Sequence, residues 1–255
     1  MNNNSSPLVQ LKNISKNFGW VNSLSNVSFD IQVGEIISLL GDNGAGKSTL
    51  IKTLAGVYPP NEGQFIWKGK AVKITNPRIA MSMGISVVYQ DLAVVPMMSI
   101  YRNFFLGREH TCGRKIGGMI VLNKKTARKI TQDALANVGI YIQDVDAPVS
   151  TLSGGERQSI AIARAIHFPS KLLIHDEPTA ALSLKETDKV LNYVKQAGKQ
   201  GVSVILITHN IGHAWKVTDR FVILYQGEVA EIAKSGEISF DELANTINTG
   251  KRTTE

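Results

Sequence analysis

The sequence predicts an α/β fold, and three segments carry that prediction. A short apolar run at 36–40 has the length and composition of a buried strand, and a glycine-rich loop and a helical pattern follow it. Two more apolar runs, at 172–174 and 205–207, are also predicted strands, and each is followed by polar side chains. Buried strands that alternate with helices are typical of the α/β class.

Length and composition fit one large domain or two small ones. The 255 residues are 43% hydrophobic, which is ordinary for a protein with a sizeable core. No apolar run approaches the roughly 20 residues that a membrane-spanning helix needs. Residues 1–7 lack the basic and apolar regions of a secretory signal, so we expect a short disordered lead. Cys112 is the only cysteine, which fits a reducing compartment, and we assign it no role.

The chain is basic, with a net charge of +7. Nucleic acid and an anionic membrane surface are both possible attractors for such a chain. The densest basic cluster is Lys124–Lys125 with Arg128–Lys129, and its helical pattern favours a solvated helix face. No basic stripe is interleaved with aromatic residues, so we expect no nucleic-acid partner.

The loop after the first strand has the spacing of a phosphate-binding loop. Residues 41–48 fit the pattern G-x-x-x-x-G-K-[ST], whose glycines let backbone N–H groups at a helix N-terminus approach an anion. Lys47 would supply a positive charge for the β- and γ-phosphates, and the Ser48 hydroxyl would be a ligand of Mg²⁺. The predicted nucleotide contacts are Gly41, Asp42, Asn43, Gly44, Ala45, Gly46, Lys47, Ser48 and Thr49.

A glycine-rich turn that matches this pattern by chance is the alternative. The strand at 36–40 before the loop and the helical pattern at 49–55 after it, which Gly56 would end, are the context that the motif requires. We therefore expect a nucleotide site at this strand end.

The strand at 172–174 runs into two carboxylates. Asp176 is expected to hold Mg²⁺, directly or through water, and Glu177 to polarise the attacking water as a general base. An ordinary strand that ends in acidic turn residues is the alternative, and the phosphate-binding loop upstream disfavours it. His175 interrupts the apolar run, and we expect an interior histidine whose hydrogen bonds are satisfied.

A second glycine-containing helix start lies at 152–158. Ser153 and Glu156 have the spacing of a capping box, and Gly154 and Gly155 leave N–H groups bare, as at an anion site. A monomer with one nucleotide has no use for two such helix starts, whereas a dimer does. The sequence therefore favours a site shared between two chains.

These motifs resemble the nucleotide-binding subunit of ATP-binding cassette (ABC) transporters. Residues 152–156 look like the signature motif of that family. The resemblance implies that Phe18 stacks on adenine, that Gln90 senses the γ-phosphate and the metal, and that His209 is the switch histidine at a strand end. It spans about residues 9 to 229.

The resemblance also implies the rest of the fold and the site. It implies a single cassette domain with a mixed central sheet, an N-terminal antiparallel β element and a helical subdomain at about 91–153. The catalytic set would be Lys47, Gln90, Glu177 and His209; the metal ligands would be Ser48, Gln90 and Asp176; the partner chain's nucleotide would be bound by Ser153, Gly154, Gly155 and Glu156.

Three of these residues have other possible roles. Phe18 could be a core aromatic, with Trp20 as the nearby rival for adenine. A lone glutamine is usually solvated, so the role of Gln90 as a γ-phosphate sensor is indicated only together with the other family motifs. His209 could merely end a strand. The loop at 180–183 departs from the family, because Ser183 stands where an aspartate is usual; Glu186 still completes capping-box spacing for a helix through 195.

The distances between these motifs indicate which branch of the family the chain resembles. Gln90 and Ser153 are 63 residues apart, which suits a small helical subdomain rather than the coiled coils of chromosome-maintenance relatives. Only 46 residues follow His209, too few for the regulatory domain of maltose-type importers. Segments 98–109, 177–183 and 208–210 resemble importers of simple sugars of the ribose, xylose and fructose type.

The resemblance implies an ATPase motor that uses ATP and Mg²⁺. Two copies would act as a homodimer on two permease chains at the cytoplasmic face of the membrane, and a separate binding protein would capture the sugar outside. An exporter or lipid-extraction ATPase is the alternative within transport, and a soluble ATPase of repair or translation is the alternative from another class.

Overall fold

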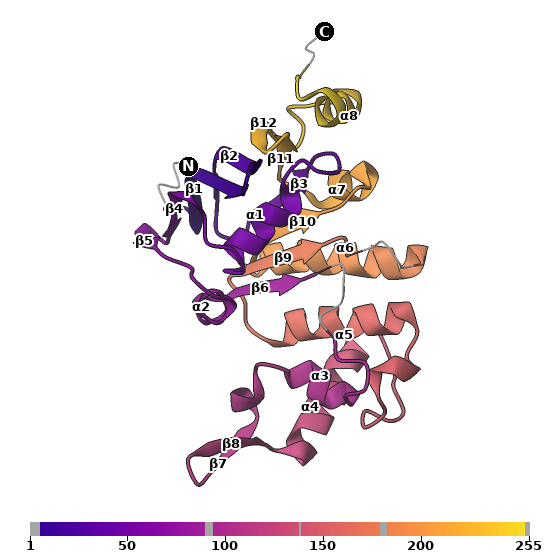
Figure 1. Cartoon of the computed structure of the whole chain (residues 1–255). Helices are drawn as coiled ribbons and strands as arrows, with labels where there is room; N and C mark the ends of the chain where they lie inside the picture. Colours follow the sequence, from indigo (N-terminus) through magenta and orange to yellow (C-terminus); the bar gives the residue numbers. More distant parts are fainter. Residues whose placement is uncertain (1–5, 90–93, 138, 179–182, 253–255) are drawn as a thin grey trace. The chain divides into compact units, whose positions relative to one another are not determined.

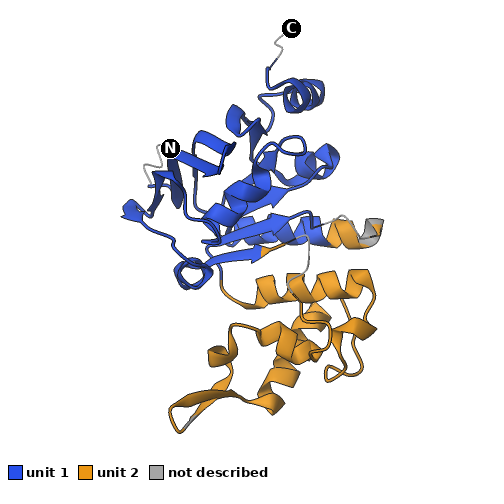
Figure 2. Ribbon diagram, viewed as in Figure 1, with its two compact units in different colours: residues 1–87, 170–179, 190–255 blue, residues 88–169, 180–189 orange. Residues whose placement is uncertain are grey.

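The computed structural model describes most of the chain and divides it into two compact units (Figures 1 and 2). The described residues are 6–89, 94–137, 139–178 and 183–252. Unit 1 comprises residues 1–87, 170–179 and 190–255, and unit 2 comprises residues 88–169 and 180–189. Some predictions from the sequence fall outside the described residues. They concern the start of the N-terminal lead, Gln90 and residues 180–182.

A six-stranded sheet forms the centre of unit 1, in the order β12–β11–β3–β10–β9–β6. Its strands are β3 (Ile36–Leu40), β6 (Ile85–Val88), β9 (Leu172–Asp176), β10 (Ser203–Ile207), β11 (Arg220–Tyr225) and β12 (Glu228–Lys234). Neighbours β11, β3, β10 and β9 run parallel, whereas β12 is antiparallel to β11. The predicted α/β class and mixed central sheet are confirmed. All five residues of β3 and of β10 are buried, which explains why these strands are apolar except for Ser38 and Ser203.

Parallel pairing brings three predicted motifs to one edge of this sheet. Ile207, near the end of β10, pairs with Leu39 of β3 on one side and with Asp176 of β9 on the other. The phosphate-binding loop, the acidic pair and His209 therefore all follow neighbouring strand ends. Ligands of open α/β sheets bind at this carboxyl edge.

The N-terminal antiparallel β element is confirmed as a second sheet, in the order β2–β1–β4–β5. Its strands are β1 (Val9–Phe18), β2 (Val21–Ile31), β4 (Glu62–Trp67) and β5 (Lys70–Val72). Phe18 pairs with Val21 across the β1–β2 turn, so the predicted adenine contact stands at the end of a hairpin.

Helices of unit 1 are α1 (Lys47–Leu54), α2 (Pro77–Met83), α7 (Ile211–Val217) and α8 (Phe240–Thr249). Helix α1 begins at Lys47, two residues earlier than expected, so Lys47 and Ser48 lie in its first turn. Helices α7 and α8 contribute Ala214 and Leu243 to an apolar cluster with Leu40 and Phe221. The strand end that carries the phosphate-binding loop is thereby anchored in packed core.

Unit 2 is mainly helical, as expected, and also contains a hairpin that was not predicted. Its elements are α3 (Ile100–Phe105), 3₁₀ turn η1 (Glu109–Thr111), β7 (Gly113–Ile116), β8 (Met119–Leu122), α4 (Lys124–Asn137), 3₁₀ turn η2 (Val149–Thr151) and α5 (Gly154–His167). Its core includes Phe104, Leu135 and Ile160. The unit contains the span expected for the helical subdomain and continues to residue 169. Assignment of both units to one cassette domain stays a prediction.

Helix α6 (Leu184–Lys199) contributes residues to both units. At its start, the Glu186 carboxylate accepts hydrogen bonds from the backbone N–H and the hydroxyl of Ser183, at 2.9 and 2.8 Å. Ser183 therefore serves the structural part of the predicted cap. Among the described residues, no helix combines the length and the apolar character that a bilayer crossing requires.

Candidate functional site

The phosphate-binding loop accepts only glycine at two of its positions. Gly41 has φ 148°, and a Cβ there would lie 2.3 Å from the carbonyl oxygen of Leu224. Gly46 has φ 100°, and its Cβ would lie 2.6 Å from the carbonyl oxygen of Ser23. Contacts below 3.0 Å are too close for a real side chain, so these glycines let the loop pack against β2 and the end of β11.

Lys47 folds its side chain back across the loop. Its ammonium donates hydrogen bonds to the carbonyl oxygens of Gly41 and Asp42, at 2.6 and 2.9 Å, and the residue is buried. Burial lowers the pKa of Lys47, while Glu177, Asp42 and Asp176 oppose that shift. The positive charge of Lys47 is thus held at the place where the β- and γ-phosphates are expected. Its present partners are neutral carbonyl oxygens, which bind an ammonium more weakly than a phosphate does.

The two hydroxyls that follow Lys47 differ in their surroundings. The Ser48 residue is exposed, as a metal ligand beside a nucleotide would be. The Thr49 hydroxyl lies 2.7 Å from the hydroxyl of Ser23 and joins α1 to β2. A nucleotide contact of Thr49 stays a prediction, and its backbone N–H is the group best suited to it.

Glu177 is held in a strained backbone conformation at the end of β9. Its φ is 50°, in the left-handed region, and its N–H donates to the carbonyl oxygen of Ile207 at 2.9 Å. Only 7% of the residue is exposed. This burial raises the pKa of the carboxyl group, while His209 opposes the shift. Strain of this kind costs about 1–3 kcal/mol and clusters at functional sites.

His209 lies next to this carboxylate. Its Nε2 is 3.3 Å from Oε1 of Glu177, and its imidazole is the more exposed of the two side chains. Oε1 is buried and has no hydrogen-bond partner among the described residues. A buried acceptor without a donor is costly, and a water molecule bound there would satisfy it.

His175 corrects one expectation. It is completely buried, as an interior histidine should be, but neither ring nitrogen has a hydrogen-bond partner in the described part of the chain. Its register partner on β10 is Leu206, which offers no polar side chain. Burial lowers the pKa of His175 to about 4, so the ring is neutral at pH 7.

The second predicted anion site begins helix α5. The capping box is confirmed: Ser153 accepts a hydrogen bond from the Glu156 N–H at 3.3 Å, and its own N–H donates to the Glu156 carboxylate at 2.8 Å. A Cβ at Gly154 would meet nothing within 4 Å. The first turn is therefore open to a ligand, although this helix start belongs to unit 2 and the phosphate-binding loop to unit 1.

The Phe18 ring is partly exposed to solvent and contacts the side chains of Tyr58 and Lys16. It is 44% exposed, and the Tyr58 ring meets it edge to face, with centroids 5.1 Å apart. The Lys16 ammonium lies 5.2 Å from the Phe18 centroid. Trp20, the rival for adenine, is fully exposed at the tip of the hairpin.

Sequence reasoning missed Tyr58. An aromatic residue two positions after Gly56, the expected end of the helix, was the only available signal. Its N–H bonds to the Lys52 carbonyl oxygen at 3.3 Å, so the turn that ends α1 brings Tyr58 to Phe18. Only the folded chain shows that these residues, 40 positions apart, form one aromatic platform.

The site therefore contains the parts that a magnesium nucleotide needs. Lys47, Ser48, Asp176, Glu177 and His209 lie at one sheet edge of unit 1, whereas Gln90 lies outside the described residues. No group of three or more His, Cys, Asp or Glu side chains in the described residues could hold a metal. A magnesium ion would thus take much of its coordination from phosphate and water, as it usually does in nucleotide sites.

Comparison with known proteins agrees with this geometry. A family model described as ABC transporter matches residues 24–180. A xylose/arabinose import ATP-binding protein of Sulfolobus acidocaldarius is 42% identical over 242 residues, or 95% of this chain and 94% of that protein. A fructose import ATP-binding protein of Rhizobium meliloti is 41% identical over 85% of this chain and 84% of that protein.

Solved structures give the same result. A dimeric bacterial ABC transporter cassette is 26% identical, with a TM-score of 0.77 over 89% of this chain and 98% of that one. A dimeric post-hydrolysis cassette bound to ADP and phosphate is 27% identical, with a TM-score of 0.76 over the same shares. The motifs, the fold and these matches show that the chain belongs to the ABC transporter family.

Proposed function

We propose that this chain is the ATP-hydrolysing motor subunit of an importer for a monosaccharide. The observation that carries the proposal is the buried Glu177 carboxylate, whose Oε1 accepts no hydrogen bond from the described residues and lies 3.3 Å from Nε2 of His209. The relatives that match over most of their length support the cargo, because they are named for import of xylose/arabinose and fructose.

Each group of the site has a defined task in this reaction. Backbone N–H groups of the phosphate-binding loop and the Lys47 ammonium bind the β- and γ-phosphates and stabilise the charge that develops on them. Glu177 accepts a hydrogen bond from water and orients it toward the γ-phosphorus, and His209 stands beside the Glu177 carboxylate. When bound, Mg²⁺ neutralises phosphate charge, and Ser48, Asp176 and Gln90 would hold it.

A homodimer would complete two such sites. The chain has two helix starts suited to anions, at Lys47 and at Gly154, on different compact units. In the proposed dimer, the nucleotide on the phosphate-binding loop of one chain meets residues 153–156 of the other. ATP closes the dimer and hydrolysis opens it. The dimeric cassettes of similar fold support this arrangement.

The partners in the membrane would be two permease chains. The subunit would lie at the cytoplasmic face of the inner membrane as a peripheral protein, and an external binding protein would deliver the sugar. Reconstitution of the chain with candidate permease and binding-protein chains from the same organism tests this. ATPase activity should rise several-fold with the cognate sugar. Stimulation by nucleic acid or ribosomes instead would favour a soluble ATPase. Stimulated activity that needs no binding protein would favour an exporter.

Replacing Phe18 with alanine should weaken nucleotide binding. Stacking of a base on an aromatic ring contributes about 1–3 kcal/mol, so the Kd for ATP should rise about 5- to 150-fold. Stacking does not read base edges, so GTP should bind nearly as well as ATP to the wild-type chain. Titration with a fluorescent ATP analogue measures both effects.

Trp20→Ala is the matched control, because it removes an exposed aromatic ring two residues away. An unchanged Kd in Phe18→Ala together with weaker binding in Trp20→Ala would move the adenine contact to Trp20. Binding of inorganic triphosphate should be the same in both variants, since it has no base to stack.

A further inference from the structure

The excess of positive over negative charge in this chain can be assigned to one segment. Residues 102–129 contain eight Lys and Arg side chains and a single acidic one, Glu109. Their net charge equals the +7 of the whole chain, so the acidic and basic residues elsewhere cancel. The chain is therefore basic because of α3, the β7–β8 hairpin and the first turns of α4, all of which belong to unit 2.

The same segment exposes consecutive apolar side chains. Met119 is 70% exposed, and Ile120 and Val121 are each 47% exposed, on strand β8. Their partners on β7 are Ile116, Lys115 and Arg114, respectively. Within unit 2, Figure 1 shows the hairpin projecting beyond the ends of the helices. Basic and apolar side chains thus lie next to each other on one projecting element.

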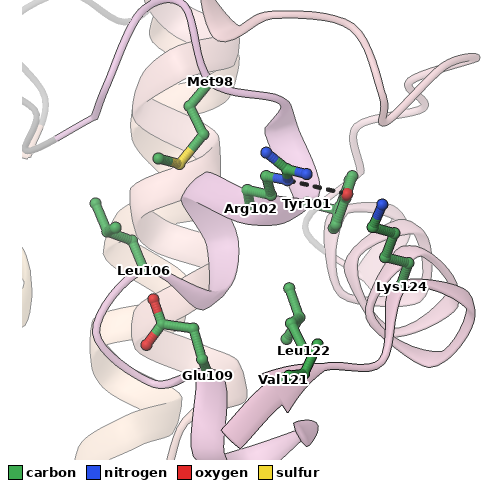
Figure 3. Close-up of a pocket in the computed structure, with 8 residues that line it drawn as sticks. All are labelled: Met98, Tyr101, Arg102, Leu106, Glu109, Val121, Leu122 and Lys124. Carbon is green, nitrogen blue, oxygen red and sulfur yellow. Dashed lines mark hydrogen bonds between the residues drawn. The ribbon is translucent and has the colours of Figure 1, made fainter. Parts of the chain in front are cut away.

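Strand β8 packs against the core of its unit at Leu122 and also borders a pocket. A cavity of about 260 Å³ separates it from α3 and is lined by Met98, Leu106 and Leu122 among others. Figure 3 shows Arg102 and Lys124 on either side of Tyr101 at this cavity, with Val121 and Leu122 at the end of the hairpin. The pocket beside β8 is therefore lined by both apolar and charged side chains, with Glu109 as its acidic residue.

Most of the basic side chains here are not neutralised within the chain. Arg128 forms a two-pronged ion pair with Asp146, with N–O distances of 2.8 Å. By contrast, the side chains of Arg114, Lys115 and Lys125 are exposed and make no hydrogen bond or ion pair with other described residues. Their charge is available to an external anion.

We propose that this basic hairpin surface, defined as residues 113–125, binds directly to the anionic phospholipids of a membrane. Clustered Lys and Arg side chains are attracted to anionic headgroups, and exposed aliphatic side chains beside them can enter the interface between headgroup and acyl chain. Residues 106–129 contain no Phe, Tyr or Trp on which bases could stack, which argues against single-stranded nucleic acid. The inference goes beyond the proposed function, because this contact needs neither nucleotide nor permease.

Flotation of the purified full chain with lipid vesicles tests the proposal. The chain should float with phosphatidylcholine vesicles that contain phosphatidylglycerol, and not with pure phosphatidylcholine. The double variant Arg114→Gln/Lys115→Gln should partition about 30-fold less, since each basic side chain near such a surface contributes about fivefold. Lys70→Gln/Lys73→Gln is the matched control: it lowers the net charge equally, at exposed residues of unit 1, and should float like wild type.

A second measurement examines the apolar residues. An environment-sensitive dye on Met119→Cys, in a Cys112→Ser background, should shift to the blue when anionic vesicles are added. The same dye on Val33→Cys, an exposed apolar position of unit 1, should not shift. ATP hydrolysis by each variant without vesicles shows that the chain is folded.

Four results would overturn the proposal. The first is failure of the wild-type chain to float with anionic vesicles. The second is an equal loss of binding in both charge variants, because this would show that the total charge of the chain causes the attraction. A dye on Met119→Cys that stays unshifted during binding would mean that the hairpin does not enter the lipid. Binding only to vesicles that carry the permease would assign the surface to a protein partner. Loss of ATPase activity with intact flotation would contradict the proposed function alone.

Discussion

Lys47→Ala should abolish ATP hydrolysis. The side chain is the buried cation of the phosphate-binding loop, and its ammonium already lies among the carbonyl oxygens of that loop. Preorganised charge of this kind stabilises the phosphoryl transition state, and loss of a single such contact commonly lowers kcat about 10²- to 10³-fold. Weaker phosphate binding lowers activity further. Steady-state ATPase assays up to saturating ATP measure the loss.

Lys12→Ala is the control for Lys47→Ala, because it removes an exposed lysine from the same unit. It should hydrolyse ATP like wild type. Thermal unfolding should show that both variants are folded, since the lost hydrogen bonds of Lys47 have only carbonyl acceptors, which water can satisfy. Near wild-type turnover of Lys47→Ala at saturating ATP would refute the assignment of the phosphate-binding loop.

Glu177→Gln should bind ATP but hydrolyse it about 10²- to 10⁴-fold more slowly. That range is typical for removal of a general base, and most ground-state contacts remain. The change also removes a negative charge beside the place proposed for the γ-phosphate. Because burial already disfavours the charged form of Glu177, the neutral amide should not destabilise the fold. Single-turnover assays with radiolabelled ATP separate binding from hydrolysis, and Glu62→Gln, an exposed glutamate of unit 1, is the control.

The slow variant should accumulate as a closed homodimer with ATP and Mg²⁺. Size-exclusion chromatography with light scattering measures its mass. Adding Ser153→Arg puts a bulky cation in the second anion site and should return the protein to monomers even with ATP. A Glu177→Gln variant that traps ATP as a monomer, and stays monomeric when its permease is present, would contradict the two-site dimer. Wild-type turnover would contradict the role of Glu177.

The sequence predicts the parts of the site that depend on contiguous residues. Loop 41–48 and the carboxylates at 176 and 177 each combine a strand with the residues directly after it, so local pattern is enough. Tyr58 depends on where a turn directs a side chain, and the unpartnered nitrogens of His175 depend on what the neighbouring strand offers. Such features arise only from tertiary packing.

The hairpin shows a second limit of sequence patterns. Strand β7 has four residues, including a glycine and two charged side chains, and this composition indicates a loop rather than a strand. Both its strands are also too short for the alternation of buried and exposed residues that identifies longer ones. The basic cluster at 124–129 is a helix face, as expected, but its charge belongs to a larger surface that the hairpin completes.

At Glu177, the residue that suits catalysis differs from the residue that would make the fold most stable. Glycine adopts φ 50° without the steric cost that glutamate bears, so glycine at 177 would relieve strain of about 1–3 kcal/mol. It would also remove a buried carboxylate oxygen that accepts no hydrogen bond from the described residues. The same change would delete the proposed general base. Selection for a sturdier protein alone would favour glycine here, so the glutamate marks a position where the chain gives up stability for chemistry.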